Sequence, residues 1–198
     1  MTQLGTWWGT WLGRNWHRVL VHGAGIAALA WLGAVYVFAL APLPDRYVML
    51  HSGTWGLVFL TATLACTPLR RWLFPRAIQV RRALGLYAFA FICIHVAVYA
   101  VAENGLDVNL ITRDLNERRA MLIGFAGFLL LIPLALTSTA GWQRWLGKRW
   151  RMLHRLVYAA ALLSVWHYLW LDRDIITTPL IYAVIVGGLL ALRLVPRA

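Results

Sequence analysis

Two histidines inside apolar runs are the residues most able to do chemistry in this sequence. His95 lies in AFICIHVAVY and His167 lies in SVWHYLW. Ionisable side chains at membrane depth are costly and usually mark a pathway or a cofactor. Neutral imidazole is an axial ligand of haem iron, and a haem held between two helices takes one from each side. The two apolar runs are expected to cross the membrane in the same direction, so the two imidazoles should reach a similar depth. We therefore predict that His95 and His167 ligate one haem; a hydrogen bond that only joins two helices is the alternative.

A third histidine, His154, lies thirteen residues before His167. On one continuous helix this spacing corresponds to about 20 Å, which suits an inner and an outer redox centre in one membrane. The same helix would point the two side chains about 140° apart, so they need not face one groove. The neighbouring Arg151 and Arg155 could pair with haem propionates or a phosphate. Positive charge beside a membrane span explains these arginines equally well.

The remaining candidate residues give weaker indications. His17 precedes the first apolar run and is expected to face solvent or lipid headgroups. His22 and His51 lie near the ends of apolar runs, where a structural hydrogen bond and a ligand role are both open. Cys66 and Cys93 are predicted to be small buried side chains. The sequence contains no G-x-G-x-x-G, Walker, G-x-S-x-G or H-E-x-x-H motif.

The elements that must position these residues are membrane-spanning helices. Hydrophobic residues make up 61% of the chain and charged residues 13%, against about 45–50% and 25% in soluble domains. A span needs about 20 predominantly apolar residues. Six segments qualify, at about 19–41, 48–69, 83–102, 120–139, 153–171 and 176–195. The fold prediction is an all-α membrane protein, with residues 1–198 forming a single six-helix transmembrane domain.

The charged residues predict how these spans are oriented. If the N-terminus is cytoplasmic, fourteen of the nineteen basic residues fall on that side and five on the other. All seven acidic residues fall on the second side: Asp45, Glu103, Asp107, Asp114, Glu117, Asp172 and Asp174. The excess of basic residues predicts that both termini of this multi-pass protein are cytoplasmic. The net charge of +12 therefore indicates a lipid bilayer as partner and not nucleic acid.

Several sequence blocks resemble one known family. They are LLLIPLALTST (129–139), LGKRW (146–150), LHRLVY (153–158) and HYLW (167–170), supported by RRALGLYAF (81–89), TPLR (67–70) and VHGAG (21–25). Together they resemble the MsrQ family, formerly YedZ, the haem-binding membrane subunits of bacterial protein-methionine-sulfoxide reductase systems. The resemblance covers nearly the whole chain. The family is in turn similar to the transmembrane domains of ferric reductases and NADPH oxidases.

The resemblance implies a function as an electron-transfer subunit rather than the catalytic subunit of an oxidoreductase system. Such a subunit carries haem b, with FMN associated with the family as a second cofactor, and passes on electrons from the quinone pool, directly or through FMN. A cytosolic flavin reductase is the alternative donor. Its partner is a periplasmic molybdopterin enzyme, MsrP, which reduces oxidised methionines in proteins. The haem-linked histidines of the family correspond to His95, His154 and His167 here.

One departure from the wider pattern concerns the inner site. In two-haem relatives the third helix carries a second histidine about fourteen residues before the outer ligand, and here that residue is Arg81. A guanidinium has no free lone pair for iron. We predict one well-ligated outer haem, and a second centre at His154 where Arg81 and Arg82 bind FMN phosphate, haem propionates or a quinol head. A ferric or quinone reductase with a small-molecule acceptor, or a non-redox scaffold, are the rival functions.

Overall fold

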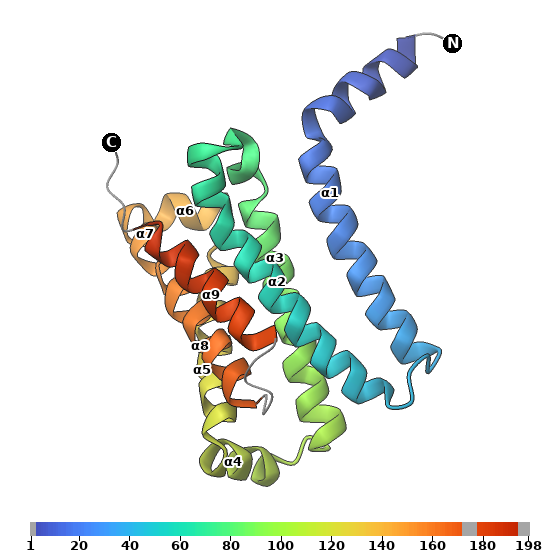
Figure 1. The fold of residues 1–198 in the computed structure, drawn as a ribbon, viewed down its shortest axis with the longest axis vertical. Coiled ribbons are helices and arrows are strands. Elements are labelled where there is room, and N and C mark those ends of the chain that lie inside the picture. Colours follow the sequence, from blue (N-terminus) through green and yellow to red (C-terminus); the bar gives the residue numbers. More distant parts are fainter. Residues whose placement is uncertain (1–2, 172–177, 194–198) are drawn as a thin grey trace.

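The computed structural model describes residues 3–171 and 178–193, which form a bundle of helices (Figure 1). The elements are α1 (Gln3–Val37), α2 (Pro44–Trp72), the 3-10 turn η1 (Pro75–Gln79), α3 (Arg81–Val98), the π-helical turn η2 (Tyr99–Glu103), α4 (Val108–Glu117), α5 (Arg119–Leu136), α6 (Ala140–Leu146), α7 (Lys148–Leu153), α8 (Leu156–Leu171) and α9 (Thr178–Ala191). The predicted all-α class is confirmed. The short surface helices α4, α6 and α7 were not expected from the sequence.

Four helices in the described part of the chain are long and apolar enough to cross a membrane. They cover Gly13–Val37, Pro44–Trp72, Arg81–Glu103 and Arg119–Leu136, in agreement with the first four predicted segments. Helix α9 is apolar but shorter, and the predicted span 176–195 lies partly outside the described residues. The chain is therefore a helical membrane protein, while its fifth and sixth spans stay predictions.

The predicted continuous helix over 153–171 is wrong at its first residues. Helix α7 ends at Leu153, His154 and Arg155 form a turn, and α8 begins at Leu156. In this turn the Arg155 amide donates to the Met152 carbonyl at 3.1 Å, a three-residue bond that tightens the backbone. The axial distance and the angle of about 140° predicted for His154 and His167 therefore do not apply, because both assumed one ideal helix.

The bundle is organised around two antiparallel helix pairs, α2 with α3 and α5 with α8, which pack most extensively. Helix α9 packs on α8 and α2, whereas α1 leans away from the others toward its N-terminal end (Figure 1). Inside the bundle Leu64, Ala88 and Phe91 are fully buried, together with Ala160 and Ala161. A stacked pair of rings joins α2 and α3, with the centroids of Phe59 and Phe91 5.4 Å apart.

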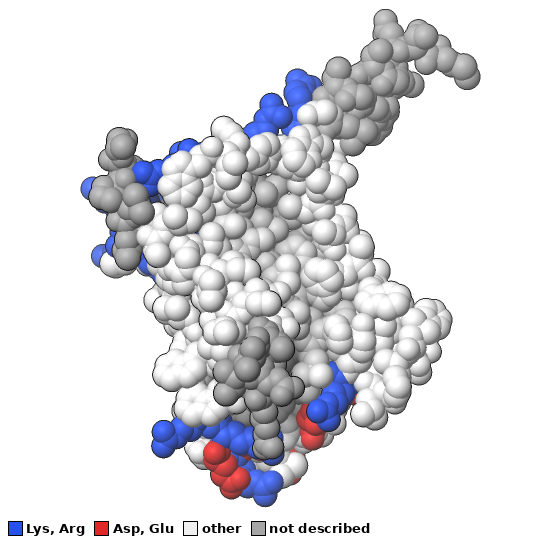
Figure 2. All heavy atoms as spheres, viewed as in Figure 1, with Lys and Arg blue, Asp and Glu red and all other residues white. Residues whose placement is uncertain are grey.

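Charged side chains gather at the two ends of the bundle and leave an apolar band between them (Figure 2). On the face shown, acidic side chains appear only at the end where α4 lies, which we call the α4 end. The opposite end, here the α7 end, carries basic side chains on the same face. This separation agrees with the predicted distribution of charge. Asp172, Arg173, Asp174 and Arg197, which were part of that prediction, lie outside the described residues.

Candidate functional site

The structure brings His95 of α3 and His167 of α8 together near the α4 end. Their ring centroids are 6.3 Å apart and the ring planes meet at 83°. Both side chains are partly buried. The two residues are far apart in the sequence and were paired only by their expected depth, so the fold supplies the contact that the prediction required.

Each of these rings is held by a backbone carbonyl of a neighbouring helix. The His95 Nδ1 atom lies 2.7 Å from the carbonyl oxygen of Met49 in α2. The His167 Nδ1 atom lies 2.7 Å from the carbonyl oxygen of Ala120 in α5. A carbonyl can only accept, so each Nδ1 must carry a proton and donate it. In the neutral imidazole this leaves the lone pair on Nε2, the tautomer that a metal ligand needs.

The separation of the two rings fits a shared haem iron. A metal–imidazole nitrogen bond of about 2 Å on each side puts two ring centroids about 6 Å apart. Among the described residues, no group of three or more His, Cys, Asp or Glu side chains is placed to hold a metal. Two axial nitrogens, one from each side of the porphyrin, are what a haem takes from the protein. The residues present therefore fit a haem better than a bare metal ion.

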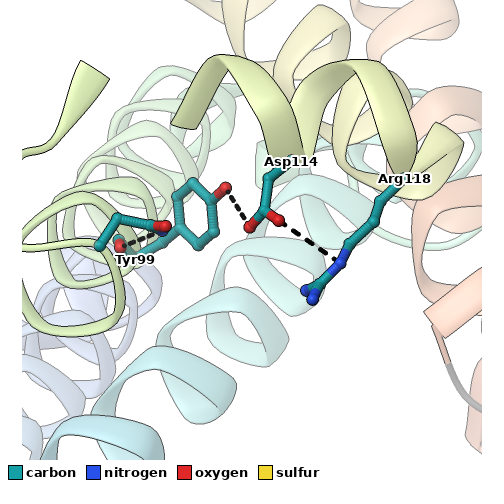
Figure 3. Close-up of polar contacts among 4 residues, drawn as sticks. Tyr99, Asp114 and Arg118 are labelled. Carbon is teal, nitrogen blue, oxygen red and sulfur yellow. Dashed lines mark hydrogen bonds and ion pairs between the residues drawn. The ribbon is translucent and has the colours of Figure 1, made fainter. Parts of the chain in front are cut away.

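A polar network beside the histidine pair ties the end of α3 to the start of α5 (Figure 3). The Tyr99 hydroxyl donates to Asp114 Oδ2 at 3.0 Å, and the other oxygen of Asp114 is 3.4 Å from Arg118 Nε. Tyr99 follows His95 by one helical turn, and Arg118 precedes Ala120 by two residues. The network thus connects the two backbone segments that hold His95 and the Ala120 carbonyl.

At the α7 end, the structure places His154 against its own segment. Its Nδ1 atom lies 3.2 Å from the Trp150 carbonyl oxygen, and its ring stacks on the Trp150 indole with centroids 3.9 Å apart. Arg81, the first residue of α3, is half-buried and close enough for its charge to act on His154, whereas Arg82 is exposed. The structure therefore brings Arg81 near His154 but leaves Arg82 on the surface.

Arg193, after the end of α9, is a residue of this region that sequence reasoning counted only as a flanking charge. Its Nη2 donates to the Leu64 carbonyl oxygen at 2.7 Å, and its Nη1 donates to the Tyr158 hydroxyl. The guanidinium lies over the Tyr158 ring, 4.7 Å from its centroid. Its Nε is buried and has no hydrogen-bond partner among the described residues. Because Leu64 is 129 residues away in the chain, only the fold reveals this position.

Arg193 and Arg81 are near enough for their like charges to interact. Among the described residues, neither forms an ion pair with a carboxylate. We call Arg81, Arg193 and His154 the basic cluster. Charged groups removed from water are normally paired, so two partly buried guanidiniums with only neutral partners favour an anionic ligand.

The other histidines make structural contacts. The expectation that His17 is solvated is wrong: it is 4% exposed and its Nε2 is 3.0 Å from Gln79 Oε1, because the first helix packs on Phe74 and the η1 turn. His22 is hydrogen-bonded to the Tyr87 hydroxyl at 3.1 Å. His51 bonds to the Tyr47 carbonyl at 2.9 Å. Cys66 is buried as expected, and Cys93 is half-buried.

Comparison with known proteins assigns the family. The family described as "Ferric reductase like transmembrane component" matches residues 52–165, more than half of the chain. A protein of Rhodospirillum rubrum named "Protein-methionine-sulfoxide reductase heme-binding subunit MsrQ" is 44% identical over 184 residues, covering 90% of this chain and 88% of the relative. The chain belongs to the MsrQ family. The resemblance seen in its sequence blocks is confirmed.

Other MsrQ proteins are similar over much of their length. The relative from Herminiimonas arsenicoxydans is 41% identical, covering 85% of this chain and 81% of its own. The one from Klebsiella pneumoniae is 38% identical, covering 90% of both. No solved structure matches the chain. The ferric-reductase-like region includes His95 and His154 and ends two residues before His167, so it contains all of α3 and α5 and the larger part of α2 and α8.

Proposed function

We propose that this MsrQ-family protein binds haem b between α3 and α8 and carries electrons across a bacterial inner membrane. The observation that supports this most directly is the pair of imidazoles with centroids 6.3 Å apart, each with Nδ1 committed to a carbonyl. The relatives are named haem-binding subunits of protein-methionine-sulfoxide reductase. The acceptor in this proposal is a periplasmic molybdopterin methionine-sulfoxide reductase, MsrP, which repairs oxidised periplasmic proteins.

The roles of the chain's own residues follow from this arrangement. His95 and His167 would hold the haem iron through Nε2, and the Met49 and Ala120 carbonyls orient the rings and would raise their basicity through the Nδ1–H bonds. When bound, haem iron supplies the one-electron chemistry. The helices provide an apolar surrounding that limits the access of water to the two partly buried rings.

We also propose that α8 and α9 cross the membrane with the four longer helices, giving six spans and two cytoplasmic termini. The excess of basic residues on the N-terminal side supports this orientation. The histidine pair then lies toward the periplasm and the basic cluster toward the cytoplasm. Electrons would move from the α7 end to the α4 end, where a periplasmic partner can collect them.

The basic cluster is proposed as the entry site. Arg81 and Arg193 carry two like charges without a carboxylate among the described residues, and planar guanidiniums suit phosphate oxygens. FMN fits this chemistry through its phosphate, with haem propionates or a quinol head as alternatives. Reduction would come from the quinone pool or from a cytosolic flavin reductase. With Arg81 in place of an imidazole, the chain is proposed to bind one haem.

The test is a reduced-minus-oxidised absorption spectrum of purified protein with haem quantified per chain. His95→Ala and His167→Ala should each lose most of the b-type bands. His51→Ala is the matched control because this exposed histidine is bonded only to its own helix. Full haem in both ligand variants would refute the assignment. An absence of b-type bands in the native protein would favour the rival function, a membrane scaffold without redox activity.

The acceptor requires a separate experiment. The reduced protein should reoxidise faster with a periplasmic molybdopterin methionine-sulfoxide reductase and an oxidised protein substrate than with ferric chelates or soluble quinones. Fast oxidation by the small acceptors alone would instead favour a ferric or quinone reductase with the same haem site.

A further inference from the structure

We propose that Gly53 and Gly124 are positioning residues for the two histidine rings, and that the α2–α3 and α5–α8 pairs build the same ring-holding arrangement twice. The spectroscopic consequence of this inference rests on the proposed haem between His95 and His167. The close approach of these two glycines to the histidine rings is a property of the chain's own contacts.

In the first pair, α2 contacts His95 at two points one helical turn apart. The Met49 carbonyl accepts the Nδ1–H bond at 2.7 Å. Four residues later, Gly53 lies against the ring. A Cβ atom added there would be 3.0 Å from Nδ1 and 3.2 Å from Cε1. Glycine therefore lets the helix backbone approach the imidazole closely enough for its preceding carbonyl to reach Nδ1.

The second pair repeats these contacts at equivalent positions. The Ala120 carbonyl of α5 accepts from His167 Nδ1 at 2.7 Å, and Gly124 follows four residues later. Here the approach is closer, since an added Cβ would be 2.6 Å from Nδ1, 2.7 Å from Cε1 and 3.0 Å from Cγ. Real Cβ atoms do not approach other atoms this closely, so any larger residue must displace the ring or the helix.

The repetition extends to the next turn of each pair. Gly56 and Gly127 each come three residues after the ring-contacting glycine. Positions for their Cβ atoms lie 3.6 Å from the Ala88 carbonyl oxygen and 3.8 Å from the Ala160 carbonyl oxygen, respectively. Both alanines are fully buried and precede their histidine by seven residues. In each pair, therefore, one helix carries a G-x-x-G segment and the other an A-x6-H segment, and the two segments pack in the same register.

The physical effect is to restrict the rotation of each ring. The terminal torsion of a histidine side chain is broad, so one hydrogen bond leaves the ring plane loosely defined. A glycine backbone packed beside Nδ1 and Cε1 limits that rotation. The two rings are then held with their planes at 83°. In a low-spin ferric haem, the angle between axial imidazole planes sets the splitting of the iron d orbitals, and so the anisotropy of its EPR signal.

The experiment compares four alanine variants of the full-length protein. Gly124→Ala should lose most of its haem or lose the strongly anisotropic EPR signal of perpendicular imidazoles. Gly53→Ala, with a less severe contact, should keep more haem but show a shifted signal. Gly127→Ala is the matched control on α5, because its Cβ would make only an ordinary contact of 3.5 Å with Leu163 Cβ. Gly188→Ala, with nothing within 4 Å, is the open-space control.

The outcomes separate this inference from the proposed function. Native haem content and an unchanged EPR signal in both Gly53→Ala and Gly124→Ala would overturn the positioning role. Equal loss in Gly127→Ala would do the same, because it would reflect general helix packing. Retention of haem by His95→Ala and His167→Ala would instead refute the haem site. If Gly124→Ala does not accumulate in membranes, Gly53→Ala decides the question. The positioning role then requires a shifted EPR signal in Gly53→Ala at a melting temperature equal to that of Gly127→Ala.

Discussion

His95 and His167 at the α4 end are held by carbonyls of neighbouring helices. His154 at the α7 end is instead bonded to the Trp150 carbonyl, four residues earlier in its own segment, with the Leu134 carbonyl of α5 also near its ring. The first arrangement exists only when the helices are assembled. It brings the two imidazole rings to a centroid separation of 6.3 Å, which is suited to one metal between them. The second keeps a ring against Trp150 and near the Arg81 guanidinium, which in turn lies within range of Arg193. One end is therefore suited to ligating iron, and the other to holding an anion.

The largest expected effect tests this difference directly. His167→Ala should abolish most haem binding, and imidazole added to the buffer should restore part of the b-type spectrum by filling the vacated ligand position. His154→Ala should retain the outer haem with an unchanged spectrum. Haem content per chain and the reduced spectrum are the measurements. If the two variants lose haem equally, the ends are not different in kind and iron is shared with His154.

The next effect concerns the anion at the α7 end. Arg193→Gln and Arg81→Gln should lower the FMN content of the purified protein several-fold while leaving haem unchanged, because each removes a charge-assisted donor for phosphate. The exposed Arg82→Gln is the control and should behave as the native protein. Flavin is measured by its fluorescence after denaturation. Unchanged flavin in both variants, with haem lost instead, would assign the basic cluster to haem propionates.

A smaller effect is expected where α7 is attached to α5. Trp150 Nε1 donates to the Thr137 carbonyl at 2.9 Å, one of the carbonyls at a helix end that lack an intrahelical partner. Trp150→Phe should therefore cost about 1 kcal/mol of local stability and release the inner cofactor more readily, with the outer haem unaffected. Thermal release of flavin and haem, followed separately, would show this. Parallel loss of both would mean that the two ends unfold together.

Much of the arrangement at the α4 end was predictable, because it depends on depth in the membrane. A histidine well inside the third apolar run and another in the outer part of the fifth reach similar depths when both runs point the same way. That argument brought His95 and His167 together. It could not identify Gly53 or Gly124, because a glycine in an apolar helix has many packing uses and only the contact with a ring distinguishes these two.

The α7 end was less predictable because local and long-range contacts decide it. The turn at His154 interrupts an apolar sequence that reads as continuous helix, and no proline or glycine lies at the break. Arg193 looks like any flanking charge until Leu64 is found beside it. His17 was expected to be solvated, yet the η1 turn covers it. For Arg193 and His17, a partner distant in sequence overrides what the neighbouring residues indicate.

The smallest expected effect lies in the network that joins the two histidine-bearing segments at the α4 end. Tyr99→Phe removes the hydroxyl that donates to Asp114 but keeps the ring. A hydrogen bond to a charged group contributes about 1.5–3 kcal/mol when buried. The Arg118 side chain of this network is 63% exposed, so solvent reduces the loss to about 1 kcal/mol or less. The variant should keep its haem and flavin and show a slightly lower melting temperature with a small change in the haem EPR signal.

Asp114→Asn, which retains an acceptor for Tyr99 but loses the ion pair, should change the melting temperature without changing the EPR signal. If Asp114→Asn alters the EPR signal as much as Tyr99→Phe does, the effect is electrostatic, and the network does not act on ring geometry through the end of α3.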